Sequence, residues 1–347
     1  MTKHGLHRII IIAAMLCLFL VLILRLDLTG QADQIQASTG EKPLVSDQPG
    51  SSVKPDSGSQ SEGFSSEKVT SPVSSLNCIH YTEKDFFKSV TAAAANIKAQ
   101  ESGDSIDALT EGPIAGGVVP HHLLAANMIA DFFQTLSMEH PETIVVIAPN
   151  HRRIGLNGLH TSLLDWKTAF GMLEADRELV TGLIDELGSS ENDSLMELEH
   201  SISGLVPYIK YYMPDTKIVP ILLHGNYSAS DSKKLGAYLA TAVQENPRIM
   251  VIASIDFSHY LDAYTADRMD EITLKAIESR NTEAIIRMGN DNIDSPPSIL
   301  ALLSAMGDIG AEGPLVTGHS NSYEITGGGA DYTTSYFTML FRSPLKE

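Results

Sequence analysis

Histidines stand just beyond the apolar, strand-like runs of this sequence. His121, His151 and His259 each follow, within a few residues, a run rich in Ile, Val and Ala. Such runs, when they end abruptly in polar residues, are typical of buried parallel strands, whose carboxyl ends meet at the sheet edge where ligands bind. One such histidine is more often a core or capping residue. The recurrence of the pattern predicts a metal site, because neutral imidazole is a common metal ligand.

Other polar residues adjoin these histidines. Asp256 ends the third run, and a buried aspartate needs a metal or a histidine as its partner. His122 and Asn150 neighbour the candidate ligands, and both are expected to support them, as are Glu199 and His200. Glu199 and His200 precede an amphipathic segment, where the carboxylate either orients an imidazole or acts as a first-turn acid that favours the helix dipole. The sequence leaves both roles of Glu199 open.

Composition limits the partners and the metal ligands. The formal net charge of −19 makes nucleic acid an unsuitable partner, because phosphate binding requires a basic face. The chain has 2 cysteines, Cys17 and Cys78, and their positions exclude a disulfide framework and a cysteine-based zinc site. A metal would therefore be held by imidazole and carboxylate groups.

The N-terminal residues predict a membrane anchor. Residues 9–24 are unbroken apolar sequence, preceded by Lys3 and Arg8. We expect residues 1–28 to form an uncleaved signal-anchor segment, with the N-terminus in the cytoplasm and the rest of a single-pass protein outside the cell membrane. A cleaved signal peptide and lipidation at Cys17 are the alternatives. Residues 29–75 are polar and predict a disordered linker.

Residues 76–347 have a globular composition in which strand-like and helix-like runs alternate. This alternation predicts a single α/β domain with a mixed, largely parallel central sheet flanked by helices. We expect strands over 114–119, 143–148, 217–223, 249–255 and 332–341. Helices are expected over 81–99, 123–136, 175–187, 201–212, 230–245, 267–279 and 299–306.

Five short motifs, in order, resemble the MEMO-like family, also called AmmeMemoRadiSam system protein B. They are Val-Pro-His-His at 119–122, Ala-Pro-Asn-His at 148–151, Glu-His-Ser-Ile at 199–202, Ser-Ile-Asp-Phe-Ser-His at 254–259 and Asn-Ser-Tyr-Glu-Ile-Thr-Gly at 321–327. The family is related to the catalytic subunits of class III extradiol dioxygenases. The resemblance therefore implies a dioxygenase-like fold over nearly the whole globular part.

The resemblance also implies residue roles. His121 and His151 match metal ligands, His259 matches an acid/base histidine, and Asp256 is its companion. Where the family often carries a cysteine ligand, this chain has Asp294. Asp294 either completes a site of two histidines and one carboxylate or only caps a helix before two prolines. If Asp294 only caps the helix, Glu199 is the alternative carboxylate ligand. The implied metal is divalent, Fe(II) first and copper or zinc next.

The implied activity is that of a metal-dependent oxidoreductase of the extradiol dioxygenase type. The alternative is a non-catalytic module that binds a small molecule or a peptide in the same pocket, because fold alone does not fix function.

Overall fold

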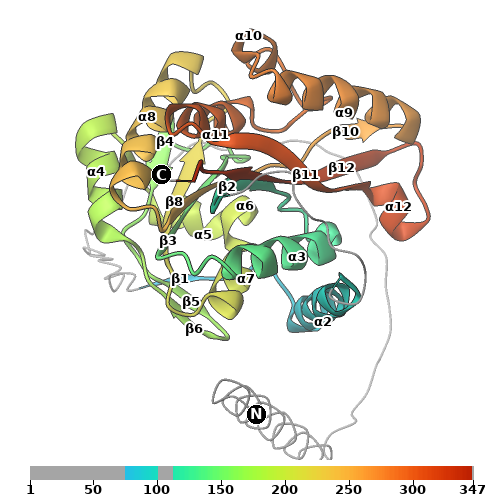
Figure 1. Ribbon diagram of the computed structural model, residues 1–347, viewed down its shortest axis with the longest axis horizontal. Helices are drawn as coiled ribbons and strands as arrows, with labels where there is room; N and C mark the ends of the chain where they lie inside the picture. Colours follow the sequence, from blue (N-terminus) through green and yellow to red (C-terminus); the bar gives the residue numbers. More distant parts are fainter. Residues whose placement is uncertain (1–74, 101–111, 346–347) are drawn as a thin grey trace, which may run out of the picture. The chain divides into compact units, whose positions relative to one another are not determined.

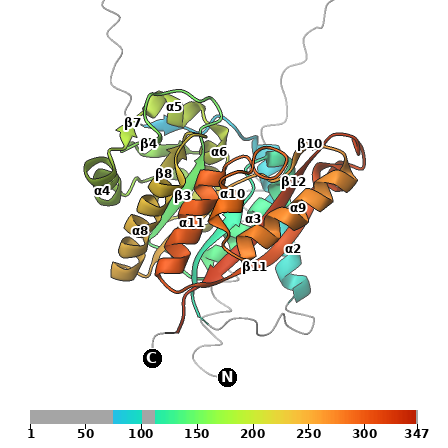
Figure 2. The same ribbon diagram turned by 90° about the horizontal axis from the view of Figure 1, so that it is seen from above.

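The computed structural model describes residues 75–100 and 112–345, and Figures 1 and 2 show how their helices and strands are arranged. A nine-stranded sheet forms the centre. Its strands run in the order β10 (His259–Leu261), β12 (Thr333–Arg342), β2 (Ile114–Val119), β9 (Ile249–Ser254), β3 (Thr143–Pro149), β8 (Lys217–Leu223), β4 (Leu159–Thr161) and β7 (Ser190–Glu191), and β11 (Glu312–Asn321) also pairs with β12.

The middle of this sheet is parallel. Strands β2, β9, β3 and β8 are parallel neighbours, whereas β12 is antiparallel to β2 and β4 is antiparallel to β8. Strands β10 and β11 both pair antiparallel with β12. The expected α/β fold with a mixed, largely parallel sheet is thereby confirmed.

Both faces of the sheet are covered by helices. Along β3, Val145 and Ile147 enter one hydrophobic core, while Ile144 and Val146 enter the other. This alternation makes the central strands apolar on both faces. The first core receives side chains from α4 (Arg177–Leu187), α8 (Ala229–Glu245), α9 (Ala263–Glu278), α10 (Thr282–Ile285) and α11 (Pro296–Asp308).

The second core lies under a different set of helices. They are α2 (Glu83–Gln100), α3 (Ala126–Ser137), α5 (Asp193–Leu198), α6 (His200–Ser203) and α7 (Val206–Tyr212). A small sheet of β1 (Leu76–Asn77), β5 (Trp166–Thr168) and β6 (Gly171–Leu173) closes this side. In Figure 1, α8 and α11 lie on one side of the central strands, and α3 and α7 on the other. Figure 2 shows α9 running beside β11 and β12.

Two short elements complete the described part, and two predictions of elements need correction. The 3₁₀ helix η1 (Leu123–Ala125) precedes α3, and α12 (Ser322–Thr326) follows β11. The single helix expected over 201–212 is divided into α6 and α7, because Pro207 lies in the first turn of α7 and lacks the N–H that a continuous helix would need. Strand β11 was not predicted, since its sequence contains Pro314 and glycines and its side chains are mostly exposed.

The expectation of a membrane anchor is corrected. Residues 1–28, on which it rested, and most of the expected linker at 29–75 lie outside the described residues. Among the helices of 75–100 and 112–345, none is long and apolar enough to cross a bilayer. The membrane as a partner, and the single-pass location that followed from it, are therefore withdrawn.

Candidate metal centre

Three neighbouring parallel strands end at the same place and deliver the candidate residues. His121 follows β2, Asp256 follows β9 and His151 follows β3, and β9 lies between the other two strands. The carboxyl edge of a parallel sheet is the usual position for a ligand site in α/β proteins. The sheet thus brings together two histidines and a carboxylate that are far apart in the sequence.

His121 is held by a chain of hydrogen bonds that fixes which of its nitrogens faces the site. Ser254 Oγ donates to the carbonyl oxygen of Ser201 at 2.6 Å and lies 3.0 Å from His121 Nδ1. Because the Ser254 hydroxyl proton is already used, Nδ1 of His121 donates to Ser254 Oγ. The other nitrogen, Nε2, lies 3.5 Å from an oxygen of Asp256 and 3.2 Å from one of Asp294, so its lone pair is placed to bind a cation held between these groups.

Glu199 holds His151 in the same way. Its Oε1 lies 2.9 Å from His151 Nδ1, and its Oε2 accepts the main-chain N–H of His151 at 2.9 Å. A carboxylate on one nitrogen of a histidine, with the other nitrogen directed at a metal, is the usual support of a metal ligand. Glu199 also accepts the N–H of Ser201 and so caps α6. Both roles left open by the sequence are thus filled by the same residue.

Asp294 reaches the site through a bridge between two loops. Phe257 and Ile293 form an isolated antiparallel bridge, and the N–H of Asp294 donates to the carbonyl oxygen of Asp256 at 3.2 Å. The N-cap residue of α11 is Ser295, so Asp294 does not cap that helix. Its side chain, only 5% exposed, points instead to the two histidines.

The distances around Asp294 fit a metal ion. Its Oδ2 lies 3.2 Å from His121 Nε2 and 3.5 Å from His151 Nε2. Donors that share one ion at 2.0–2.2 Å lie about 3 to 3.5 Å from one another. The buried Oδ1 of Asp294 has no hydrogen-bond partner among the described residues. A buried carboxylate oxygen without a partner is costly, and a cation would satisfy it.

Two overlapping groups of donors share His121. His121, Asp256 and Asp294 form one group, and His121, His151 and His200 form the other, with the donor atoms of each group within 4.8 Å of one another. His200 was predicted only to support the ligands, and its side chain is 47% exposed. Its position beside His151 was not evident from the sequence, because it depends on how α6 is placed against the end of β3.

The remaining predicted residues lie around this cluster. Asp256 Oδ1 accepts the main-chain N–H groups of His121 and His122, at 3.1 and 3.4 Å. His122 Nδ1 lies 2.7 Å from the hydroxyl of Tyr336. Asn150 binds both main-chain groups of Ile154 and so shapes the loop after β3.

His259 is the predicted residue that stands apart from both donor groups. It begins β10, and its Nδ1 is buried without a hydrogen-bond partner in the described part of the chain. The hydrogen bonds of Asp256 go to the main chain at His121 and His122, so Asp256 supports the loop of a candidate ligand. The roles predicted for His259 and Asp256 remain predictions.

Electrostatics keep the carboxylates of the cluster ionised. Burial lowers the pKa of His151, but hydrogen bonds to Asp294 and Glu199 outweigh it and raise that pKa to about 10. Burial also opposes a charge on His121, and Asp256 and Asp294 nevertheless raise its pKa. Against burial, the histidines hold the pKa of Asp294 and of Glu199 well below the usual range. Without a metal the protonated histidines therefore pair with these carboxylates, and a divalent cation that binds here would displace their protons.

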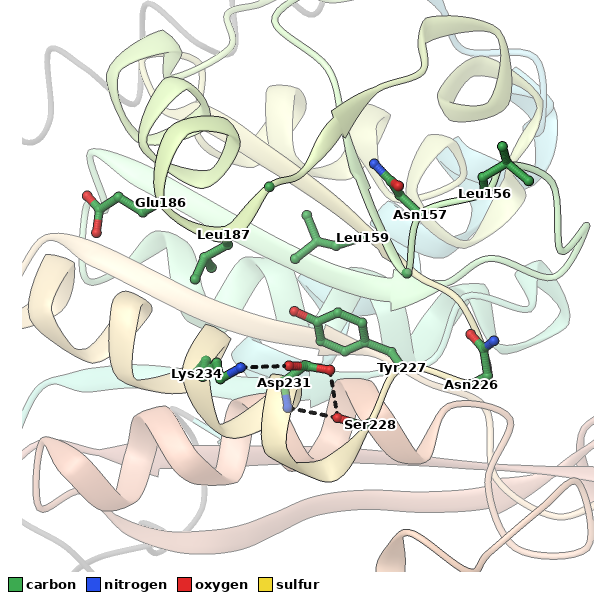
Figure 3. Close-up of a pocket in the computed structure, with 12 residues that line it drawn as sticks. Leu156, Asn157, Leu159, Glu186, Leu187, Asn226, Tyr227, Ser228, Asp231 and Lys234 are labelled. Carbon is green, nitrogen blue, oxygen red and sulfur yellow. Dashed lines mark hydrogen bonds and ion pairs between the residues drawn. The ribbon is translucent and has the colours of Figure 1, made fainter.

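A cavity away from the cluster lacks the grouped histidines and carboxylates of the candidate metal centre. This cavity lies beside the start of α8 and has a volume of about 460 Å³. Tyr227 and Leu159 are among the lining residues that Figure 3 shows. Its Asp231 is bonded to Ser228 and Lys234, so that carboxylate is already neutralised by local partners. None of the residues predicted for the site lines this cavity.

Comparison with known proteins agrees with the resemblance in the sequence. A MEMO1 family protein of Pyrobaculum aerophilum is 31% identical over 238 residues, which are 66% of this chain and 84% of that protein. A MEMO1 family protein of Aquifex aeolicus is 28% identical over 234 residues, which are 65% of this chain and 84% of that protein.

The solved structure of an uncharacterized protein of Escherichia coli K12 is 16% identical to this chain, with a TM-score of 0.43. The match covers 65% of this chain and 99% of that protein. The family model of the Memo-like proteins matches residues 99–340, well over half of the sequence. The resemblance read from the motifs is confirmed, and the chain belongs to the Memo-like protein family.

Proposed function

We propose that this chain binds a divalent transition metal, Fe(II) by preference, through His121, His151 and Asp294, and that it acts as an oxidoreductase of the extradiol dioxygenase type. One observation carries the proposal. The Nε2 atoms of both histidines lie 3.2 and 3.5 Å from the same oxygen of Asp294, whose other oxygen is buried and has no partner in the described part of the chain.

The ligand types favour iron over softer ions. Imidazole and carboxylate suit Fe(II), whereas a thiolate in place of Asp294 would favour Cu(I) or zinc. A site of two histidines and one carboxylate leaves coordination positions open for oxygen and substrate, and the iron supplies the redox chemistry between them. Copper and zinc remain the alternative ions for the same donors.

The protein residues have separate tasks in this proposal. Ser254 and Glu199 hold His121 and His151 in the orientation that a metal requires. Asp256 holds the loop of His121 through its main-chain hydrogen bonds. His259 is the acid/base residue of this proposal, the role that the family resemblance implies.

Oxygen consumption tests the proposed reaction. The full chain, loaded with Fe(II) without air, is expected to consume oxygen when a catechol is added. His259→Gln should keep its iron, but its rate of oxygen consumption should fall about 100-fold or more, because general acid–base catalysis usually contributes a factor of at least this size. His319→Gln removes a histidine outside the cluster and is the matched control. A chain that holds iron but consumes no oxygen with catechols would rule out the dioxygenase reaction and leave the metal centre standing.

A second candidate function is a non-catalytic module that binds a small ligand. It is favoured by a cavity of about 190 Å³ that is lined by His80, Phe86, Leu123 and Tyr208. The ring of His80 is 6.1 Å from that of His200, so this cavity adjoins the cluster. Apolar cavities of about 150 Å³ bind a benzene ring. A His121→Ala chain that kept its metal but lost binding of a small aromatic ligand would support the module and contradict the enzyme.

A further inference from the structure

We propose that His200 is a third imidazole ligand of the metal centre. Glu199 is the positioning residue that orients the rings of His151 and His200. The inference rests on the proposed metal centre and extends its donor set. It differs from the roles drawn from the sequence, in which His200 only supported the ligands.

The geometry of the three rings points to this role. One ring nitrogen from each of His121, His151 and His200 lies within 4.8 Å of the other two. The rings of His151 and His200 stack, with centroids 4.6 Å apart and planes 22° apart. Both of these rings are 5.1 to 5.2 Å from the ring of His121. Three imidazole rings therefore lie together, each with a nitrogen near the nitrogens of the other two.

Glu199 fixes the same nitrogen in both stacked rings. Its Oε1 lies 2.9 Å from His151 Nδ1 and 3.1 Å from His200 Nδ1. The Glu199 side chain is 1% exposed, and an ionised carboxylate can only accept hydrogen bonds. Nδ1 of His151 therefore donates to it, and the Nε2 atom of that ring keeps its lone pair for a metal. His200 Nδ1 is in charge contact with the same oxygen.

The backbone around Glu199 makes this arrangement rigid. Glu199 lies at the junction of α5 and α6, and its Oε1 also accepts the N–H of Ser201. Ser201 Oγ in turn donates to the carbonyl oxygen of Pro149, at the end of the strand that carries His151. Glu199 and Ser201 thus tie the segment of His200 to the segment of His151.

A third imidazole ligand changes which metal ions the centre prefers. Together with Asp294, the histidines form a set of three nitrogens and one oxygen, which suits zinc, copper, cobalt or iron and disfavours magnesium and calcium. His200 is the ligand nearest to solvent, with a side chain 47% exposed against 1% for His121. Its loss should therefore weaken metal binding without unfolding the chain.

Cobalt binding by the full chain tests the inference. Co(II) is titrated in competition with a chelator, and its visible absorption reports the number and type of ligands. His200→Ala is expected to weaken Co(II) binding by about 10-fold or more and to change the absorption spectrum of the saturated chain. His319→Ala is the matched control, because it removes an imidazole that bonds to Asp270 and belongs to neither donor group. It should leave affinity and spectrum unchanged.

A second variant separates positioning from ligation. Glu199→Gln keeps all the ligands, and it is expected to weaken Co(II) binding by about 10- to 100-fold while the spectrum at saturation is retained. If His200→Ala, and equally His200→Gln, binds Co(II) with the wild-type affinity and spectrum, the inference is overturned. If the wild-type chain binds no Co(II) at all, the proposed metal centre itself fails, which is a distinguishable result.

Discussion

Two buried carboxylates of the cluster differ because their surroundings differ. Glu199 has its oxygens occupied by N–H groups of His151 and Ser201 and is in charge contact with His200, so its charge is satisfied by the protein. Asp294 faces two imidazole nitrogens with Oδ2, while its buried Oδ1 has no partner in the described residues. A satisfied carboxylate orients its neighbours, whereas the unpartnered oxygen of Asp294 would be satisfied by a cation.

Another buried carboxylate, Asp270, lies outside the cluster and serves the fold. It accepts hydrogen bonds from Ser258 at 2.6 Å, Ser335 at 2.7 Å and His319 Nε2 at 2.9 Å. Burial lowers the pKa of His319, but the hydrogen bond and the charge of Asp270 outweigh it, so the pKa is raised above 6.5. Protonated His319 therefore stabilises the folded chain.

This pair predicts a pH dependence of stability. Because the folded pKa of His319 is raised, its contribution is complete below pH 6.5 and is lost as pH rises through the raised value. The free energy of unfolding of wild type and His319→Gln is compared by denaturant titration at about pH 5.5 and about pH 9 in the presence of a chelator. The free energy of unfolding of the wild type should exceed that of the variant by more at the lower pH than at the higher pH. An equal difference at both pH values would show that the pair does not titrate in this way.

At the scale of elements, the site depends on close packing of β2. A Cβ atom on Gly117 would lie 2.4 Å from the carbonyl oxygen of Met339 and 2.8 Å from the ring of Phe132. Glycine is therefore needed where β2 lies between β12 and α3. Since His121 directly follows β2, a shift of this strand would also move the candidate ligand.

Gly117→Ala is accordingly expected to destabilise the fold by about 3 kcal/mol, at the upper end of the cost of overpacking. Gly289→Ala is the matched control, because a Cβ at that position meets no atom within 4 Å. Its free energy of unfolding should stay within about 0.5 kcal/mol of wild type, as for ordinary surface changes. Equal stability of the two variants, measured by urea denaturation, would contradict the close packing assigned to β2.

The parts that could be predicted from the sequence are those with a local signal. Strands 114–119 and 217–223 have the expected bounds, because long apolar runs between polar residues define them. The ends of the runs over 114–119 and 143–148 also marked His121 and His151. In contrast, the stacking of His200 on His151 arises from the contact of α6 with β3, and the support of His121 by Ser254 arises from three separate segments. Such contacts between distant segments leave no local pattern.

At the scale of the whole molecule, the fold gathers negative charge at one end of its central sheet. Asp256, Asp294 and Glu199 are buried there beside three histidines. Burying charge is costly unless it is paired, so a divalent ion would remove much of that cost. A ligand that binds only the folded state stabilises it by about 2.7 kcal/mol at a concentration 100 times its dissociation constant. Metal binding and stability are therefore expected to be coupled in this chain.

The metal content of the purified full chain tests the central claim most directly. After Fe(II) or Zn(II) is supplied without air and excess ion is removed, elemental analysis of the wild type should find about one metal ion per chain, as expected for one set of donors. His151→Ala should lose most of this metal, while His319→Ala should retain it. Wild type without bound metal, or His151→Ala with the same content as wild type, would contradict the metal centre.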